Sequence, residues 1–239
     1  MMARRKLALI GLGKMGRVLS QLAPERGWEV VATIGSTDNQ NGSGITPQTL
    51  EGADVVIEFT TPNAAPANVR AAVGARCPVV VGTTGWSAEL PALSEWVKTH
   101  DGAMLSAANF SVGVNAFEQI IAVASRLLAS SGGFDAHLVE THHAAKKDAP
   151  SGTAITLRGS AAAAWPGDIP VTSVRTGSVP GTHEMIFDAP FETITLTHTA
   201  RDRRVFAEGA LVAAAWLIGR KGVFTMRDVL MSPTKAGAA

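Results

Sequence analysis

The stretch Leu7-Ala8-Leu9-Ile10-Gly11-Leu12-Gly13-Lys14-Met15-Gly16 decides the fold of this chain. Its first four residues are apolar without alternation, which is typical of a central strand buried on both faces of a parallel sheet. The glycines follow the spacing G-x-G-x-x-G, and a helical pattern continues to Pro24. Glycines at these positions allow a tight turn and a close approach of the backbone to a pyrophosphate at the helix N-terminus. We therefore predict a strand, a turn and a helix that bind a dinucleotide through Gly11, Leu12, Gly13, Lys14, Met15 and Gly16; the alternative is a tight turn without a ligand.

Strand-like and helical segments alternate through the rest of the amino-terminal half. Apolar runs occur at residues 28–34, 53–59, 78–82 and 103–106, and helical patterns lie at about residues 63–74 and 87–99. Residues 35–48 are polar and rich in glycine, which indicates a loop. Strands that alternate with helices build βαβ units. The expected fold is α/β, with a Rossmann-type doubly wound parallel sheet.

Two more loops are expected at the sheet edge where the glycine loop lies. Gly82, Thr83 and Thr84 follow one buried strand, and Ala107, Ala108, Asn109 and Phe110 follow the next. Ligands of doubly wound sheets bind at the carboxyl ends of the strands. We expect both loops to contact the cofactor, although each also fits an ordinary turn between a strand and a helix.

The end of the second strand lacks the acidic residue that usually binds the ribose 2′-hydroxyl of NAD. Gly35, Ser36 and Thr37 follow Ile34 instead. Because a carboxylate there would repel a 2′-phosphate, its absence removes the argument for strict use of NAD. The expected cofactor is NADPH or NADH, or both.

The pattern changes after Val112. Helical patterns lie at residues 115–129 and 154–165, and strand-like runs lie at residues 134–140, 171–175, 183–187 and 192–198. Strands with little helix between them predict an inserted α+β domain with antiparallel pairing. An alanine-rich helix is expected at residues 205–218 and a closing turn at residues 224–230. We expect residues 1–110 and 205–239 to form the dinucleotide-binding domain, and residues 111–204 to form the inserted domain.

The composition narrows the class of protein. The chain has 239 residues, of which 46% are hydrophobic and 17% are charged, so a disordered chain is excluded. The net charge of +1 gives no reason to expect a nucleic-acid partner. A single cysteine, Cys77, excludes a disulfide framework and a cysteine-rich zinc site, and the absence of tyrosine excludes a phenolic acid catalyst.

Membrane and export signals are not expected. No apolar stretch reaches the roughly 18 residues of a membrane span. The basic N-terminus leads into an apolar run that ends at Gly11, without the apolar core and cleavage site of a signal peptide. The chain is expected to be soluble and cytoplasmic, without a membrane partner.

The segment from Glu140 to Ala154, ETHHAAKKDAPSGTA, carries the densest chemistry. His142, His143 and Lys146 supply proton donors near neutral pH and cationic partners for carboxylates. Ser151, Gly152 and Thr153 follow Pro150 and offer hydroxyls and free backbone N–H groups at a helix start, which suits an anion. Adjacent histidines in an extended segment point to opposite sides, so we expect two different roles.

Two other interpretations of this segment stay open. A metal site would need a third ligand, for which Glu140, Asp148 and His183 are the candidates; we expect no metal. A charge cluster is also often a solvated loop without function, but its coupling to an anion site favours function.

The same segment resembles the signature of the dihydrodipicolinate reductase family, E-x-H-H-x-x-K-x-D-x-P-S-G-T-A, which is met at every specified position. The resemblance extends nearly from end to end and includes the glycine loop, residues 82–85, 107–113, 206–210 and 226–230, and Arg175, Gly177, Gly181, His183 and His198. This sequence departs from the family pattern at two places, both in the predicted cofactor-binding region. Many members have a first loop that is one residue longer, G-x-x-G-[RK]-M-G, and an acidic residue where Gly35 stands here.

What the resemblance implies is an NAD(P)H-dependent oxidoreductase of lysine and diaminopimelate biosynthesis. It would reduce 4-hydroxy-tetrahydrodipicolinate to tetrahydrodipicolinate with loss of water. By family correspondence His142 is the general acid/base and Lys146 the proton donor, and the small dicarboxylate is bound by His143, Ser151, Gly152 and Thr153. The family also implies a homotetramer assembled through the sheet of residues 111–204, which makes this part the substrate-binding and oligomerisation domain.

Two other functions fit part of the sequence. Another two-domain NAD(P)-dependent dehydrogenase, acting on a small amino or keto acid, would share the glycine loop but not the histidines and Lys146 beside Ser151. A catalytically silent dinucleotide sensor would bind the cofactor but would need no proton donor.

Overall fold

A computed structural model describes residues 4–232 of the chain. The chain divides into two compact units. The first unit contains the residues up to Val112 together with those from Phe206 onward, and the second unit contains Gly113–Val205.

The first unit is built on a six-stranded sheet in which every pairing is parallel. Its strands are β1 (Arg5–Ile10), β2 (Trp28–Ile34), β3 (Val55–Glu58), β4 (Val79–Val81), β5 (Ala103–Ser106) and β10 (Gly222–Phe224), in the order β10-β5-β4-β3-β1-β2. The order reverses at β1 and β3, as in doubly wound folds. The expected Rossmann-type parallel sheet is therefore confirmed.

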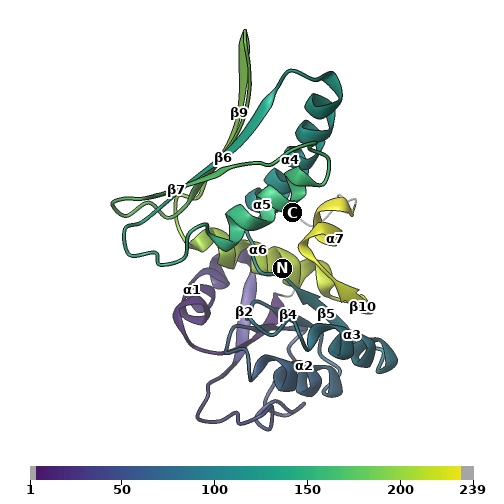
Figure 1. Cartoon of the computed structure of the whole chain (residues 1–239). Helices are drawn as coiled ribbons and strands as arrows, with labels where there is room; N and C mark the ends of the chain where they lie inside the picture. The colour runs from purple at the N-terminus through teal and green to yellow at the C-terminus, as the bar shows by residue number, and fades with distance from the viewer. Residues whose placement is uncertain (1–3, 233–239) are drawn as a thin grey trace. The chain divides into compact units, whose positions relative to one another are not determined.

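Helices cover both faces of this sheet (Figure 1). They are α1 (Lys14–Leu22), α2 (Ala65–Gly74), α3 (Leu90–Thr99), α6 (Arg204–Leu217) and the short α7 (Met226–Met231); a 3₁₀ turn, η1, spans Pro24–Arg26. Because side chains alternate along a strand, Leu7 and Leu9 belong to the core beneath α1 and α6, whereas Ala8 and Ile10 belong to the core beneath α2 and α3. This two-sided burial explains the unbroken apolar run in the sequence.

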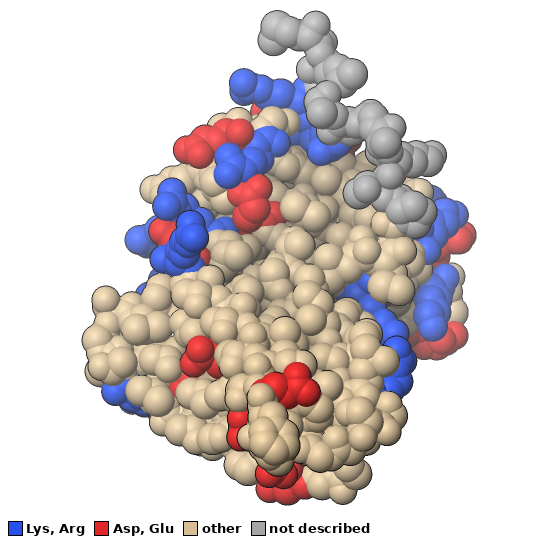
Figure 2. All heavy atoms as spheres, turned by 90° about the horizontal axis from the view of Figure 1, so that it is seen from above, with Lys and Arg blue, Asp and Glu red and all other residues tan. Residues whose placement is uncertain are grey.

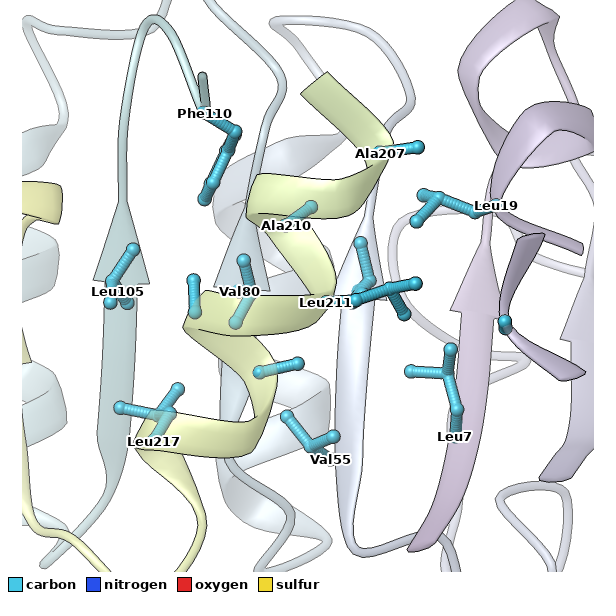
Figure 3. Close-up of a cluster of buried hydrophobic side chains, with 14 of the residues drawn as sticks. Leu7, Leu19, Val55, Val80, Leu105, Phe110, Ala207, Ala210, Leu211 and Leu217 are labelled. Atoms are coloured by element: carbon cyan, nitrogen blue, oxygen red, sulfur yellow. The ribbon is translucent and has the colours of Figure 1, made fainter. Parts of the chain in front are cut away.

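Helix α6 lies across β1, β3, β4 and β5, although it is far from these strands in the sequence (Figure 3). Ala207, Ala210, Leu211 and Leu217 project from one side of the helix onto the strands. The contact is close at Gly209, where a Cβ atom would lie 1.7 Å from the carbonyl oxygen of Phe110. Small residues on α6 therefore let its backbone approach the loop that follows β5.

The expected closing turn at residues 224–230 is wrong. The segment forms strand β10 and helix α7 instead. Thr225 and Asp228 form a capping box that starts α7, and Gly222–Phe224 pairs with β5 as the edge strand of the sheet.

The second unit has a four-stranded sheet in the order β7-β6-β8-β9. Its elements are α4 (Val112–Ser131), β6 (Asp135–His142), α5 (Gly152–Ala162), β7 (Val171–Arg175), β8 (Thr182–Ala189) and β9 (Glu192–Thr199). The expected antiparallel pairing holds for β6 with β8 and for β8 with β9, but β6 and β7 are parallel. The reason is that α5 connects β6 to β7 and supplies the long crossover that parallel neighbours need.

Helices α4 and α5 pack on one face of the second sheet. Phe117 and Ile121 of α4 and Leu157 of α5 join Leu138 and Phe187 of the strands in one core. Helix α4 is 20 residues long with a mean hydropathy of 1.3, so it meets the length and composition of a membrane span, contrary to the expectation that no stretch does. It contains Glu118, which accepts a hydrogen bond from Ser160. Phe117 and Ile121 serve this core, whereas Ile120, Val123 and Leu127 of the same helix are exposed.

Charged side chains of both signs are mixed on the face of the molecule that Figure 2 shows. This pattern agrees with the net charge of +1.

Candidate functional site

The glycine loop between β1 and α1 presents backbone rather than side chains. Gly11 has a φ of +91°, and a Cβ atom there would lie 2.1 Å from the carbonyl oxygen of Phe59. A Cβ atom on Gly16 would lie 2.0 Å from the carbonyl oxygen of Gly11, so both positions require glycine for packing. At Gly13 nothing lies within 4 Å of a Cβ atom, which leaves open space at the first turn of α1. The unpaired N–H groups of a helix start suit a pyrophosphate at this place.

The other residues of this loop take different positions. Leu12 and Lys14 are exposed, and the carbonyl group of Leu12 accepts a hydrogen bond from Arg17. Met15 is half-buried and packs against the core beneath α6. The loop therefore offers a basic side chain, Lys14, next to its backbone N–H groups.

The loops after β4 and β5 lie at the same edge of the sheet, since all these strands are parallel. Gly82 is half-buried, and Thr84 and Ala108 are exposed. Thr83 is only 8% exposed, and its hydroxyl accepts a hydrogen bond from the backbone N–H of Thr60 at 2.7 Å.

The loop after β5 also combines more accessible residues with a buried one. Ala107 and Asn109 are half-buried, and the Asn109 side chain accepts a hydrogen bond from the backbone N–H of Ser111. Phe110 is 3% exposed in the core, with its ring 6.0 Å from that of Phe59. The side chains of Thr83 and Phe110 thus support these loops from within.

A buried polar network at this edge was not found from the sequence. Glu58, the last residue of β3, is fully buried and accepts hydrogen bonds from Thr60 and Asn68. Asn68 continues the network by accepting from Asn39 in the loop after β2. Burial raises the pKa of Glu58, against the opposing effect of its hydrogen bonds to Thr60, Thr83 and Asn68. The available signal was an acidic residue at the end of an otherwise apolar strand, Val55–Glu58.

In the second unit, strand β6 leads from the core into a polar cluster. Its alternation places Leu138, Glu140 and His142 on the face that α4 and α5 cover. Glu140 has no exposed surface, and its Oε2 atom pairs with Nδ1 of His142. His143 follows the end of the strand and is half-exposed, which fits the expectation that the two histidines face different surroundings.

Arg175, the last residue of β7, holds this cluster together. It lies beside His142 in the parallel register and donates from Nη2 to Oε1 of Glu140 at 2.6 Å. The same nitrogen donates to the backbone carbonyl of Asp148 at 2.6 Å, which ties the loop after β6 to β7. Lys146 in that loop donates to both oxygens of Asp148, at 2.8 and 2.9 Å.

The start of α5 closes the cluster. Ser151 is the N-cap of this helix: its hydroxyl accepts from the backbone N–H of Ala154, and its own N–H donates to Glu140 at 3.3 Å. Ser151 is 2% exposed, so its hydroxyl serves the cap, whereas Gly152 is exposed and Thr153 half-exposed at the same helix start. The predicted substrate residues are thus adjacent, with Ser151 in a supporting position.

The charges of the cluster follow from these contacts. Burial would raise the pKa of Glu140, but hydrogen bonds from Arg175, Ser173 and His142 outweigh it and bring this pKa down to about 2. Burial lowers the pKa of His142, against the effect of Glu140. Burial and the neighbouring His142 lower the pKa of His183 to about 4. The cluster at neutral pH therefore contains a carboxylate, a guanidinium and a neutral His183.

A metal-like arrangement is also present, and it contains His142 with two of the three ligands considered above, Glu140 and His183. Ligand atoms of Glu140, His142 and His183 lie within 4.8 Å of one another, whereas Asp148 pairs with Lys146. Such a donor set suits zinc. Both oxygens of Glu140 already meet His142 and the cationic Arg175, however, and Arg175 would repel a metal ion, so we propose none here.

Comparisons with known proteins identify the family. Two family models match: "Dihydrodipicolinate reductase, N-terminus" over residues 5–110 and "Dihydrodipicolinate reductase, C-terminus" over residues 113–230. The 4-hydroxy-tetrahydrodipicolinate reductase of Christiangramia forsetii is 35% identical over 236 residues, which cover 94% of this chain and 97% of that protein. The enzyme of the same name from Caldanaerobacter subterraneus is 37% identical over 243 residues, 91% of this chain and 94% of that protein.

A solved structure shares the fold. The dipicolinate-bound dihydrodipicolinate reductase of Paenisporosarcina sp. TG-14 superposes with a TM-score of 0.77 at 21% identity and covers 93% of this chain and 97% of its own. From the family models and the curated relatives together, this chain belongs to the dihydrodipicolinate reductase family.

Proposed function

We propose that the chain is the NAD(P)H-dependent reductase that converts 4-hydroxy-tetrahydrodipicolinate to tetrahydrodipicolinate. Membership of the family supports the reaction, and the relatives named above carry the same activity in their names. The observation that carries the chemistry is the cluster of Glu140, His142, Arg175 and Lys146 beside the start of α5.

The dinucleotide fits the glycine loop of the first unit. The open space at Gly13 and the N–H groups at the start of α1 suit its pyrophosphate, with Lys14 as a nearby cation. Gly82, Thr84, Ala107, Ala108 and Asn109 supply the neighbouring loop surface, and Gly11, Thr83 and Phe110 shape it from below. When bound, NAD(P)H supplies the hydride.

The dicarboxylate substrate fits the start of α5 in the second unit. The backbone N–H of Gly152 and the hydroxyl of Thr153 suit one carboxylate, and the half-exposed His143 and Lys146 supply charge beside it. In this proposal Ser151 orders the helix start through its cap rather than binding the substrate directly.

The proton comes from the same cluster. Negative charge develops on the substrate as it accepts hydride, and a positioned acid neutralises it. His142 and Lys146 are the acids that the cluster offers. Lys146 is held by Asp148, which keeps its ammonium group in the loop after β6.

A cytoplasmic homotetramer is part of this proposal. Val139, Val174 and Ile186 point to the face of the second sheet opposite α4 and α5, and they are half-buried or exposed. Apolar groups on a sheet face favour burial against other subunits, and we propose that the second sheet forms the subunit contact.

The test is an assay with freshly generated substrate, supplied first with NADH and then with NADPH. We expect substrate-dependent oxidation of both, with NADPH used at least as well as NADH, because Gly35 offers no carboxylate against the 2′-phosphate. A strong preference for NADH would contradict the cofactor part of the proposal. Binding of NADPH without any turnover would point to a dinucleotide sensor.

A further inference from the structure

We propose that Glu140, held by Arg175, is a positioning residue that fixes the Nδ1–H tautomer of His142 and stabilises its imidazolium form. This inference rests on the proposed function, in which His142 is the acid. It adds two residues, Glu140 and Arg175, to those that the reaction needs.

The contacts of Glu140 fix the orientation of its carboxylate. Oε2 meets Nδ1 of His142, and Oε1 accepts from Nη2 of Arg175 at 2.6 Å and from the N–H of Ser151 at 3.3 Å. Arg175 keeps this carboxylate ionised, because its cation and hydrogen bond favour the charged form. An ionised carboxylate only accepts hydrogen bonds, so Nδ1 of His142 must carry the proton.

The other ring nitrogen of His142 faces a glycine. A Cβ atom on Gly181, where φ is +155°, would lie 3.0 Å from Nε2 of His142. Any side chain at position 181 would therefore crowd Nε2. With Nδ1 committed to Glu140, Nε2 is the nitrogen that exchanges a proton with the substrate.

The ionisable groups around the ring act on its charge in different directions. The anion of Glu140 favours the imidazolium, whereas burial and the cations of Lys146 and Arg175 oppose it. His183 lies edge-on with its centroid 5.2 Å from that of His142, and it is neutral because burial first, and then His142, lower its pKa to about 4. Glu140 is therefore the one neighbour among these that stabilises a proton on His142.

The proton balance is simple. In the imidazolium both nitrogens carry hydrogen; the Nε2–H bond breaks as a bond from that hydrogen to the substrate forms. The ring becomes neutral and keeps its Nδ1–H bond to Glu140. The carboxylate stays ionised throughout, as the acidic partner does in a Ser-His-Asp triad.

The experiment replaces Glu140 with glutamine, which has the same shape but no charge. Ring ¹⁵N chemical shifts of His142 report the tautomer and its titration in the free protein, without turnover. We expect Nδ1–H in the wild type, and in Glu140→Gln a mixed or reversed tautomer with the pKa of His142 lower by about one unit or more. We also expect kcat to fall roughly 10²-fold or more. The fall of kcat with rising pH should begin at a lower pH than in the wild type, and the KM for the dicarboxylate should change little.

Two further variants keep this test decisive. Glu192→Gln makes the same change at the exposed start of β9 in the same sheet, and should leave tautomer and kcat unchanged. If Glu140→Gln does not fold because Arg175 is left unpaired, Glu140→Gln/Arg175→Gln removes both charges. It should show the same change of tautomer, with a smaller pH shift because the opposing cation of Arg175 is also gone.

An unchanged tautomer and pH profile in the folded Glu140 variants would overturn the inference, as would a changed tautomer with normal kcat. Failure of the proposed function is seen separately, because the wild-type protein would then not reduce the substrate at all.

Discussion

At the scale of single residues, two buried glutamates have opposite shifts in pKa. Among the residues that the structure describes, the groups that act on Glu58 are the neutral ones of Thr60, Thr83 and Asn68, and burial raises its pKa. Glu140 meets the guanidinium of Arg175, so its pKa falls to about 2 although burial opposes this. Burial therefore dominates the pKa of Glu58, whereas the cationic neighbour of Glu140 holds that carboxyl group as an anion.

Glu58→Gln tests the first of these states through stability. Since the folded pKa of Glu58 is raised above the unfolded value of 4.5, its favourable contribution is present below that value and is lost as pH rises through the folded pKa. Glutamine resembles the protonated acid but does not ionise. We expect the unfolding free energy of Glu58→Gln, relative to wild type, to increase from pH 4 towards pH 8 in denaturant titrations. The exposed Glu29→Gln on β2 is the control, and a difference for Glu58→Gln that does not change with pH would contradict the prediction.

His142→Gln and Lys146→Ala test the proton donors. General acid catalysis typically contributes 10²–10⁴-fold, so we expect each change to lower kcat by about that factor. NADPH affinity should stay within a few-fold, because the glycine loop is untouched, and the double variant should lose less than the product of the single losses. The neighbouring exposed Lys147→Ala should retain activity. Normal kcat in both single variants would show that the loop has no catalytic part.

Thr153→Val tests capture of the carboxylate at the start of α5. Losing one charge-assisted hydrogen bond costs roughly 1.5–3 kcal/mol, which should appear as a higher KM for the dicarboxylate with little change in dinucleotide affinity. Thr156→Val is a matched control, since that hydroxyl donates to the backbone carbonyl of Gly152 within the helix at 3.1 Å. Weaker binding of the dinucleotide instead would assign this loop to the cofactor.

At the scale of elements, the packing of α6 depends on the lack of a side chain at Gly209. Alanine normally favours a helix over glycine by about 1 kcal/mol, but here its Cβ atom would lie 1.7 Å from the backbone of Phe110. We expect Gly209→Ala to lower the melting temperature clearly. Gly159→Ala, in α5 with nothing within 4 Å of a Cβ atom, should raise it. If both changes stabilise the protein, the contact of α6 is looser than described.

The elements that sequence patterns predicted are those with a local signal. Apolar runs identified β1 and its parallel neighbours, the run at residues 134–140 indicated a strand, and Ser151 after Pro150 indicated a capped helix. The partner of Glu140, Arg175, was not predictable in this way, because it lies 35 residues away and reaches Glu140 through the pairing of β6 with β7. The strand β10 was missed for a similar reason: three residues carry little pattern, and only their contact with β5 makes them a strand.

At the scale of the whole molecule, the proposed assembly has a direct test. Light scattering of the wild type should give about four times the chain mass of 24.8 kDa. Ile186→Lys places a charge on the open face of the second sheet and should reduce this mass. Ile155→Lys makes the same change on the exposed side of α5 and should leave it unaltered. A tetramer in Ile186→Lys would show that subunits associate through another surface.

The late position of α6 and β10 in the chain has a consequence for biosynthesis. During translation β1 to β5 emerge first, and the face that α6 covers stays open until residues beyond Arg204 leave the ribosome. The second unit, by contrast, is contiguous from Gly113 to Val205 and holds all of its own core before that point. Domains fold as units while they emerge, so the later-starting unit completes first. Until α6 has emerged, the first unit exposes an apolar sheet face. In this interval a chaperone has the largest apolar surface to bind.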